Sequence, residues 1–108
     1  MKTKEIIANL TNLAKVIRKD IDMPYELRRA MRKNYNTLSE EYKIYEEERS
    51  KLIIQLKEGE NEKEIEEKLE AILETEVNVD IIKVSESLME NVVCSTSDDM
   101  SLQFMLVD

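Results

Sequence analysis

The chain is 108 residues long, carries a formal net charge of −8, and contains one Gly, one Pro, one Cys and no His or Trp. This length suits a single domain with one modest core. A single Gly excludes the glycine-rich loops of P-loop and dinucleotide-binding proteins, and the absence of His excludes the usual catalytic triad and His-based zinc sites. We therefore expect a protein that is not an enzyme and that holds no metal and no cofactor.

Charge is distributed unevenly along the chain. Residues 1–54 carry 12 Lys and Arg against 9 Asp and Glu, whereas residues 55–108 carry 4 against 15. The acidic excess argues against nucleic acid as a partner and favours a protein with a basic surface. One cysteine cannot form a disulfide within the chain, and no apolar stretch has the length of a signal peptide's core or a membrane span. We therefore expect a cytoplasmic protein without membrane contact.

Apolar residues at helical spacing predict a first helix over residues 3–19. Ile6, Leu10, Leu13 and Ile17 follow one another at steps of four, three and four. This is the period of an α-helix that buries one face. The break that follows ends at Pro24, a residue that fits the first position of a new helix.

The second predicted helix runs from Pro24 to Glu58 and is the longest element. Its apolar and aromatic residues form a heptad-like seam that is interrupted once by a charge, and its members are Met31, Tyr35, Leu38, Tyr42, Tyr45, Arg49, Leu52 and Leu56. Such a seam packs against neighbouring helices of the same chain or against a second copy in a homodimer. Arg49 then either emerges at a gap between two flanking helices or specifies the register of that dimer.

A third helix is predicted after the only glycine. Gly59 lies where a helix needs a left-handed residue at its C-terminal end, and Asn61 followed by Glu64 is a capping box for the next helix. Ile65, Leu69 and Ile72 form its apolar stripe. Because short connections make antiparallel neighbours, we expect the first helix to cover the N-terminal half of the long helix and the third helix to cover its C-terminal half.

The last third of the chain has a different pattern. Residues 77–84 are β-branched and alternate in polarity, which predicts a short strand. Residues 99–107 fit either a strand or a helix, and the cap residues before them favour a short helix. The predicted fold is therefore mainly α: a single domain over residues 1–108, with a three-helix antiparallel body over 3–75 and a strand with a small C-terminal element over 76–108.

A regular row of carboxylates lies on the third predicted helix. Its members, Glu62, Glu66, Glu70 and Glu74, repeat every four residues, so they follow one face at steps of about 6 Å. This acidic stripe has two interpretations. It imitates the phosphates of a nucleic acid for a basic partner such as a nuclease, or it is a solvated face that keeps the protein soluble.

A basic cluster opens the long helix. It consists of Arg28, Arg29, Arg32 and Lys33. Arginine is suited to planar, bidentate contacts with phosphates or carboxylates, so the cluster is a candidate partner-binding surface. The alternative is that it pairs with acidic residues of its own chain or of a second copy.

Several segments together resemble a family of small helical proteins, without an assigned activity, that phages and prophages of low-GC Gram-positive bacteria encode. The resemblance rests on Pro24 at a helix start, on residues 38–49 (LSEEYKIYEEER), on residues 73–81 (LETEVNVDI), and on an ending with Asp99-Met100 and Phe104-Met105-Leu106. It implies a phage accessory protein that acts inside the bacterial host cell, and it favours a helix at the C-terminus. It assigns no role to any residue.

Three functions follow from these features. The first is a non-enzymatic interaction module that binds, and inhibits, a host defence nuclease such as a CRISPR effector through its acidic surface. The alternative is a phage structural or assembly accessory that associates with itself through the coiled-coil-like long helix. A DNA-binding regulator is third, because only the basic cluster favours it. We prefer the first, because charge asymmetry has no evident use in simple self-assembly.

Overall fold

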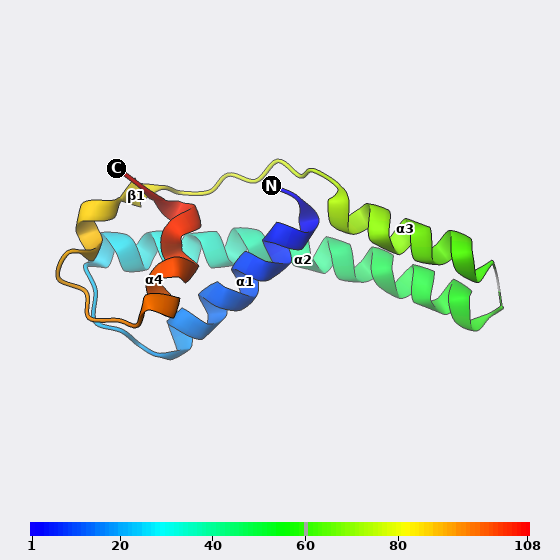
Figure 1. Cartoon of the computed structure of the whole chain (residues 1–108), viewed down its shortest axis with the longest axis horizontal. Helices are drawn as coiled ribbons and strands as arrows, with labels where there is room; N and C mark the ends of the chain where they lie inside the picture. The colour runs from blue at the N-terminus through cyan, green and yellow to red at the C-terminus, as the bar shows by residue number, and fades with distance from the viewer. Residues whose placement is uncertain (60) are drawn as a thin grey trace.

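The fold is built on one long helix whose two halves are covered by different partners (Figure 1). The structure is a computed structural model that describes residues 1–59 and 61–108. Its elements, in chain order, are α1 (Thr3–Arg18), α2 (Tyr25–Lys57), α3 (Glu62–Glu74), β1 (Val84–Ser85), the 3₁₀ turn η1 (Glu86–Met89), α4 (Thr96–Leu102), the 3₁₀ turn η2 (Gln103–Met105) and β2 (Leu106–Val107). The mainly helical architecture predicted from the sequence is confirmed.

The antiparallel arrangement of the three main helices is confirmed as well. α1 runs back along the N-terminal half of α2, and α3 returns along its C-terminal half (Figure 1). We call α1, the N-terminal half of α2 and residues 84–107 the head, and α3 with the C-terminal half of α2 the arm. The molecule is elongated, 55 Å by 24 Å by 21 Å, because the arm extends beyond the head.

Local sequence signals set the ends of the helices. Gly59 has a φ of 81° after the end of α2, a left-handed conformation that glycine adopts without the penalty that a Cβ brings. Asn61 then caps α3, because its Oδ1 accepts a hydrogen bond from the backbone N–H of Glu64 at 3.2 Å. Gly59 and the Asn61 cap lie where the sequence placed them, and of the predicted capping box the described contact is the one from the Glu64 N–H to Asn61.

The main core lies in the head. It consists of buried side chains from α1, the connection to α2, α2 itself, β1, α4 and η2: Leu13, Val16, Met23, Leu27, Ala30, Met31, Val84, Leu102 and Met105. Of the predicted seam, Met31, Leu38 and Leu52 are buried, whereas Arg49 is exposed. The seam is therefore the line along which α2 packs against its own chain, with Arg49 facing solvent.

The strand predicted over residues 77–84 is wrong for all but its last residue. The segment is extended, but only Val84 and Ser85 form β1, which pairs in parallel with Leu106 and Val107 of β2. The alternation has another cause: Val77, Val79 and Ile81 are half-buried, and the residues between them are exposed. The alternation therefore arises because one side of an extended chain is partly buried, and not because the segment pairs with another strand.

A buried asparagine of α2 pairs with this extended segment. The Nδ2 atom of Asn34 donates to the carbonyl of Ile82 at 2.9 Å, and its Oδ1 accepts from the N–H of Ile82 at 2.8 Å. Nδ2 also lies 3.6 Å from the sulfur of Met105. The carboxamide is fully buried and acts as a neighbouring strand would, because it satisfies both backbone groups of one residue.

The C-terminal segment contains both of the structures that its sequence allowed. α4 begins with a reciprocal capping box between Ser95 and Asp98, and η2 and the short strand β2 follow it. Asp98 also accepts a 2.8 Å hydrogen bond from Lys19 Nζ, which joins the start of α4 to the end of α1. The helical expectation is thus confirmed for residues up to Leu102, and the strand alternative holds for Leu106 and Val107.

Replacement of Asn34 by Ala tests how much this carboxamide stabilises the fold. The substitution leaves the N–H and C=O of Ile82 without their partner, so we expect the free energy of unfolding to fall by about 1–3 kcal/mol. Urea denaturation followed by circular dichroism measures the change. Asn78→Ala, at an exposed position of the same segment, serves as the control and should stay within about 0.5 kcal/mol of wild type. Equal losses in both variants would contradict the role given to Asn34.

Candidate functional site

The acidic stripe lies on the outer side of the arm. Ile65 of α3 is buried, and Leu69 and Ile72 are half-buried, so this face of the helix packs against α2. Glu62, Glu66, Glu70 and Glu74 are all exposed. The fold therefore presents the predicted stripe to solvent, on the part of the molecule that extends furthest from the head (Figure 1).

The last glutamate of the stripe forms ion pairs within the chain. Glu74 lies 2.9 Å from Lys2 Nζ and 2.6 Å from Lys4 Nζ, which joins the end of α3 to the start of α1. Hydrogen bonds from Lys4 and Lys2 lower the pKa of the Glu74 carboxyl to about 2. A carboxylate at a helix C-terminus opposes the helix dipole, and the two lysines offset that cost.

The other three stripe glutamates have no such partner in the described chain. An ion pair on the body of α3 joins Lys68 to Glu64, at 3.4 Å and one turn apart. Among residues 1–59 and 61–108, no Lys or Arg lies within 4 Å of the carboxylates of Glu62, Glu66 or Glu70. These three side chains are therefore available to a basic partner.

The basic cluster lies at the opposite end of α2, in the head. Arg28, Arg29, Arg32 and Lys33 are exposed, and the guanidinium of Arg28 donates to the carbonyl of Met23 at 3.1 Å. Within the described part of the chain, none of the four forms an ion pair. Together with Tyr25 and Asn36 they surround a surface depression of about 250 Å³.

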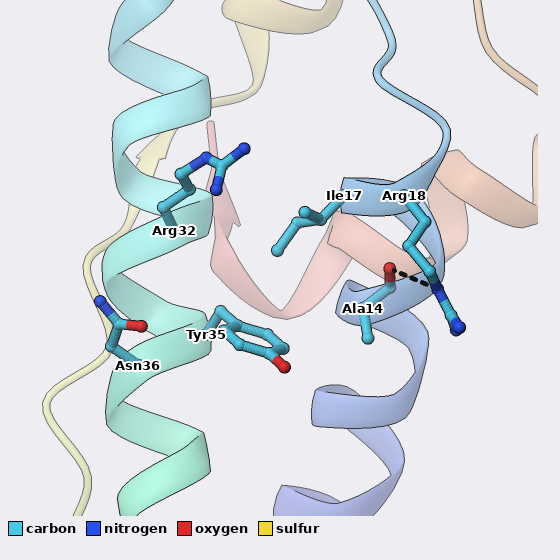
Figure 2. Close-up of a pocket in the computed structure, with 6 residues that line it drawn as sticks. All are labelled: Ala14, Ile17, Arg18, Arg32, Tyr35 and Asn36. Atoms are coloured by element: carbon cyan, nitrogen blue, oxygen red, sulfur yellow. Dashed lines mark hydrogen bonds between the residues drawn. The ribbon is translucent and has the colours of Figure 1, made fainter.

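A second depression adjoins the first, between α1 and α2. Its volume is about 420 Å³, and it is lined by Ala14, Ile17, Arg18, Arg32, Tyr35 and Asn36. Figure 2 shows Ile17 of α1 and the ring of Tyr35 pointing into the space between the helices, while Arg18 turns its guanidinium away. Arg32 and Asn36 line both depressions, so the two form one groove.

The sequence analysis predicted the four cations of the basic cluster as a candidate binding surface, but it did not predict the other residues of this groove. Arg18 and Ile17 come from α1 and reach the cluster only because α1 packs against α2, a contact that no local pattern specifies. Tyr35 was expected as a member of the seam, and Asn36 carried no signal. The acidic stripe and the basic cluster lie on different parts of the molecule, so they form two surfaces rather than one site.

The acidic side chains and the single thiol are the groups most relevant to metal binding and covalent chemistry. No group of three or more Cys, Asp or Glu side chains within them is placed to hold a metal ion. Burial raises the pKa of the half-buried Cys94 thiol, and the charges of Asp98 and Asp99 raise it further. The thiol is therefore protonated at neutral pH, which is the less nucleophilic form.

In the described part of the chain, none of the helices combines the length and the apolar character that crossing a bilayer requires. Comparison of the chain with protein-family models, with curated proteins and with solved structures finds no match. The function must therefore be inferred from the surfaces themselves.

The pKa of Glu74 is directly testable. We expect its carboxyl to titrate at about 2 in the folded protein, against 4.5 in the unfolded chain. Because the folded pKa is lowered, the contribution of this group to stability is complete above pH 4.5 and is lost as the pH falls towards 2. Carboxyl NMR titration measures the pKa, and Lys2→Ala with Lys4→Ala should return it towards its usual value. An unchanged pKa in that double variant would contradict the pairing.

Proposed function

We propose that the protein is a non-enzymatic interaction module whose arm binds a basic surface of a partner protein through Glu62, Glu66 and Glu70. The observation that carries this proposal is the exposure of these three carboxylates, in register on one helix and without a described cation beside them. Like charges one turn apart destabilise a helix by about 0.2–0.5 kcal/mol per pair, so stability alone does not favour the row.

The shape of the arm supports the same proposal. α3 has 13 residues and is about 20 Å long, and it lies on the segment of α2 that extends beyond the head (Figure 1). A narrow two-helix projection can enter a cleft that a broad surface cannot. Carboxylates at steps of about 6 Å along it then meet several cations of the partner at once.

The partner class that we propose is a host defence nuclease, such as a CRISPR effector, inside a bacterial cell. A nuclease lines its substrate channel with Lys and Arg, because phosphate contacts dominate its affinity for nucleic acid. An acidic arm that occupies such a channel excludes the substrate. The resemblance to phage-encoded proteins supports this class, since a phage gains from blocking host defence.

Self-association through the long helix receives less support from the same observations. Leu38 and Leu52 of the seam are buried, and α1 and α3 cover the two halves of α2. A coiled coil with a second copy would have to displace these helices first. We therefore do not assign the seam to assembly.

Charge reversal on the arm tests the proposal. This variant, called the arm variant, carries Glu62→Lys, Glu66→Lys and Glu70→Lys. It leaves Glu74 in place, because Glu74 joins α3 to α1. We expect the partner that wild type retains from a host lysate to be lost by at least about tenfold, since several charge-assisted contacts are reversed. Quantitative mass spectrometry of the retained proteins measures this loss.

A second, control variant has the same net charge as the charge-reversed variant but leaves the acidic stripe intact. It carries Glu40→Lys, Glu86→Lys and Glu90→Lys, which are exposed positions outside the stripe that form no ion pair with the described residues. We expect it to retain the partner as wild type does. Equal loss in both variants would mean that net charge, and not the stripe, governs binding, and would overturn the proposal.

The inhibitory role has its own experiment. We expect expression of the wild-type chain in bacteria that carry an active defence nuclease to raise the plating efficiency of a targeted phage. The arm variant should leave plating at the level of cells without the protein, whereas the control variant should behave as wild type. Unchanged plating with the wild-type chain, across hosts with different defence nucleases, would contradict inhibition.

A further inference from the structure

We propose that the groove of the head binds a free nucleotide, with the planar base between α1 and α2 and the phosphates on the basic cluster. This site is separate from the acidic arm and does not depend on the function proposed above. It rests on three observations: a depression with apolar walls, a row of cations beside it that form no ion pair with the described residues, and two residues that line both parts.

The slot between the helices has the chemistry that a base requires. Ala14 and Ile17 provide an aliphatic wall on α1, and Tyr35 provides an aromatic face on α2 (Figure 2). Its volume of about 420 Å³ lies within the usual range for small-molecule sites, about 300–1,000 Å³. Asn36, the residue after Tyr35, also lines the slot, but its side chain projects from the opposite side of α2 (Figure 2), where it borders the adjoining depression.

The adjoining depression has the chemistry that phosphates require. Arg28, Arg29 and Lys33 line it, and Arg32 lies between it and the slot. Guanidinium groups bind phosphate oxygens through paired, charge-assisted hydrogen bonds. This arrangement needs no glycine-rich loop, so the single Gly of the chain does not exclude it.

Among the described residues, the cations of the groove make two local hydrogen bonds, from Arg28 to the carbonyl of Met23 and from Arg18 to the carbonyl of Ala14, but no ion pairs. The chain contains 24 Asp and Glu, yet none of those described forms an ion pair with Arg18, Arg28, Arg29, Arg32 or Lys33. Cations near a helix N-terminus oppose the dipole, so helix stability favours acidic residues there instead. A bound anion would relieve both the mutual repulsion of the cluster and its conflict with the dipole.

The surroundings favour a small ligand over a nucleic-acid strand. Glu26 precedes the cluster on α2, and Glu40 follows Lys33 after two turns of the same helix, so exposed carboxylates bracket the basic surface. A longer polyanion would meet them, and the net charge of −8 would repel it further. A mononucleotide with two or three phosphates is short enough to avoid the carboxylates of Glu26 and Glu40.

Calorimetric titration of the full chain with ATP, GTP, CTP and UTP tests the proposal. We expect at least one of them to bind saturably at one site per chain. Inorganic tripolyphosphate and the matching nucleoside should each bind at least about tenfold more weakly, because each fills only one part of the groove. Arg32→Ala should weaken nucleotide binding by about tenfold or more, since it removes contacts to a charged group.

Matched controls separate this site from general charge effects. Lys51→Ala, an exposed cation on the arm, should leave nucleotide binding unchanged, and so should the arm variant with three reversed glutamates. Arg32 is exposed, so its replacement should leave the circular-dichroism spectrum and melting temperature as in wild type.

Four outcomes would contradict the proposal. The first is the absence of saturable binding with all four nucleotides. The second is tripolyphosphate that binds as tightly as the best nucleotide, which would indicate adventitious anion binding only. The third is a single-stranded oligonucleotide that binds more tightly than the best nucleotide, which would make the groove a strand-binding surface. NMR shifts confined to residues outside Ala14, Ile17 and Tyr35 would also contradict the placement of the base.

Discussion

The carboxamide of Asn34 holds the extended segment after α3 against α2, on the path by which the chain returns to the head. After α3 the chain lies near the middle of α2, and it has to travel back along that helix to reach the head (Figure 1). An extended backbone beside a helix has no natural hydrogen-bond partner, because the backbone groups of the helix are already paired. Asn34 provides one donor and one acceptor at Ile82, two residues before β1 begins. The core residues Val84, Leu102 and Met105 enter the head beyond this point.

The same constraint separates the two charged surfaces. Because residues 84–107 are brought back to the head, α3 remains alone on the C-terminal half of α2, and the arm has two helices instead of a complete bundle. Its buried side chains are few, chiefly Leu52 and Ile65, so most of α3 faces solvent. The acidic stripe is exposed for this reason, and the ion pairs of Glu74 with Lys2 and Lys4 join the arm to the head at their junction.

Helices and their ends were predictable from the sequence because their causes are local. The 3.6-residue period of α1, Gly59 at a left-handed position and the Asn61 cap each depend on residues within one or two turns. The strand over 77–84 was wrong because alternation records burial on one side and does not specify what covers it. The role of Asn34 could not be predicted, because its hydrogen-bond partner Ile82 lies 48 residues further along the chain. Of the groove, the sequence predicted the basic cluster, because its cations are neighbours in sequence. Ile17 of α1 and Tyr35 of α2 line one depression only because the two helices pack together.

The rigidity of α2 explains how one small chain keeps two surfaces of opposite charge. Lys33 and Leu52, the buried α2 residue of the arm, are 19 residues apart, which is about 28 Å along a helix. This separation is several times the screening length of about 8 Å at physiological ionic strength, so the cluster and the stripe barely interact. A continuous helix also prevents them from folding together and neutralising each other. The net charge of −8 therefore describes neither surface, and the electrostatic field of each is nearly independent of the other.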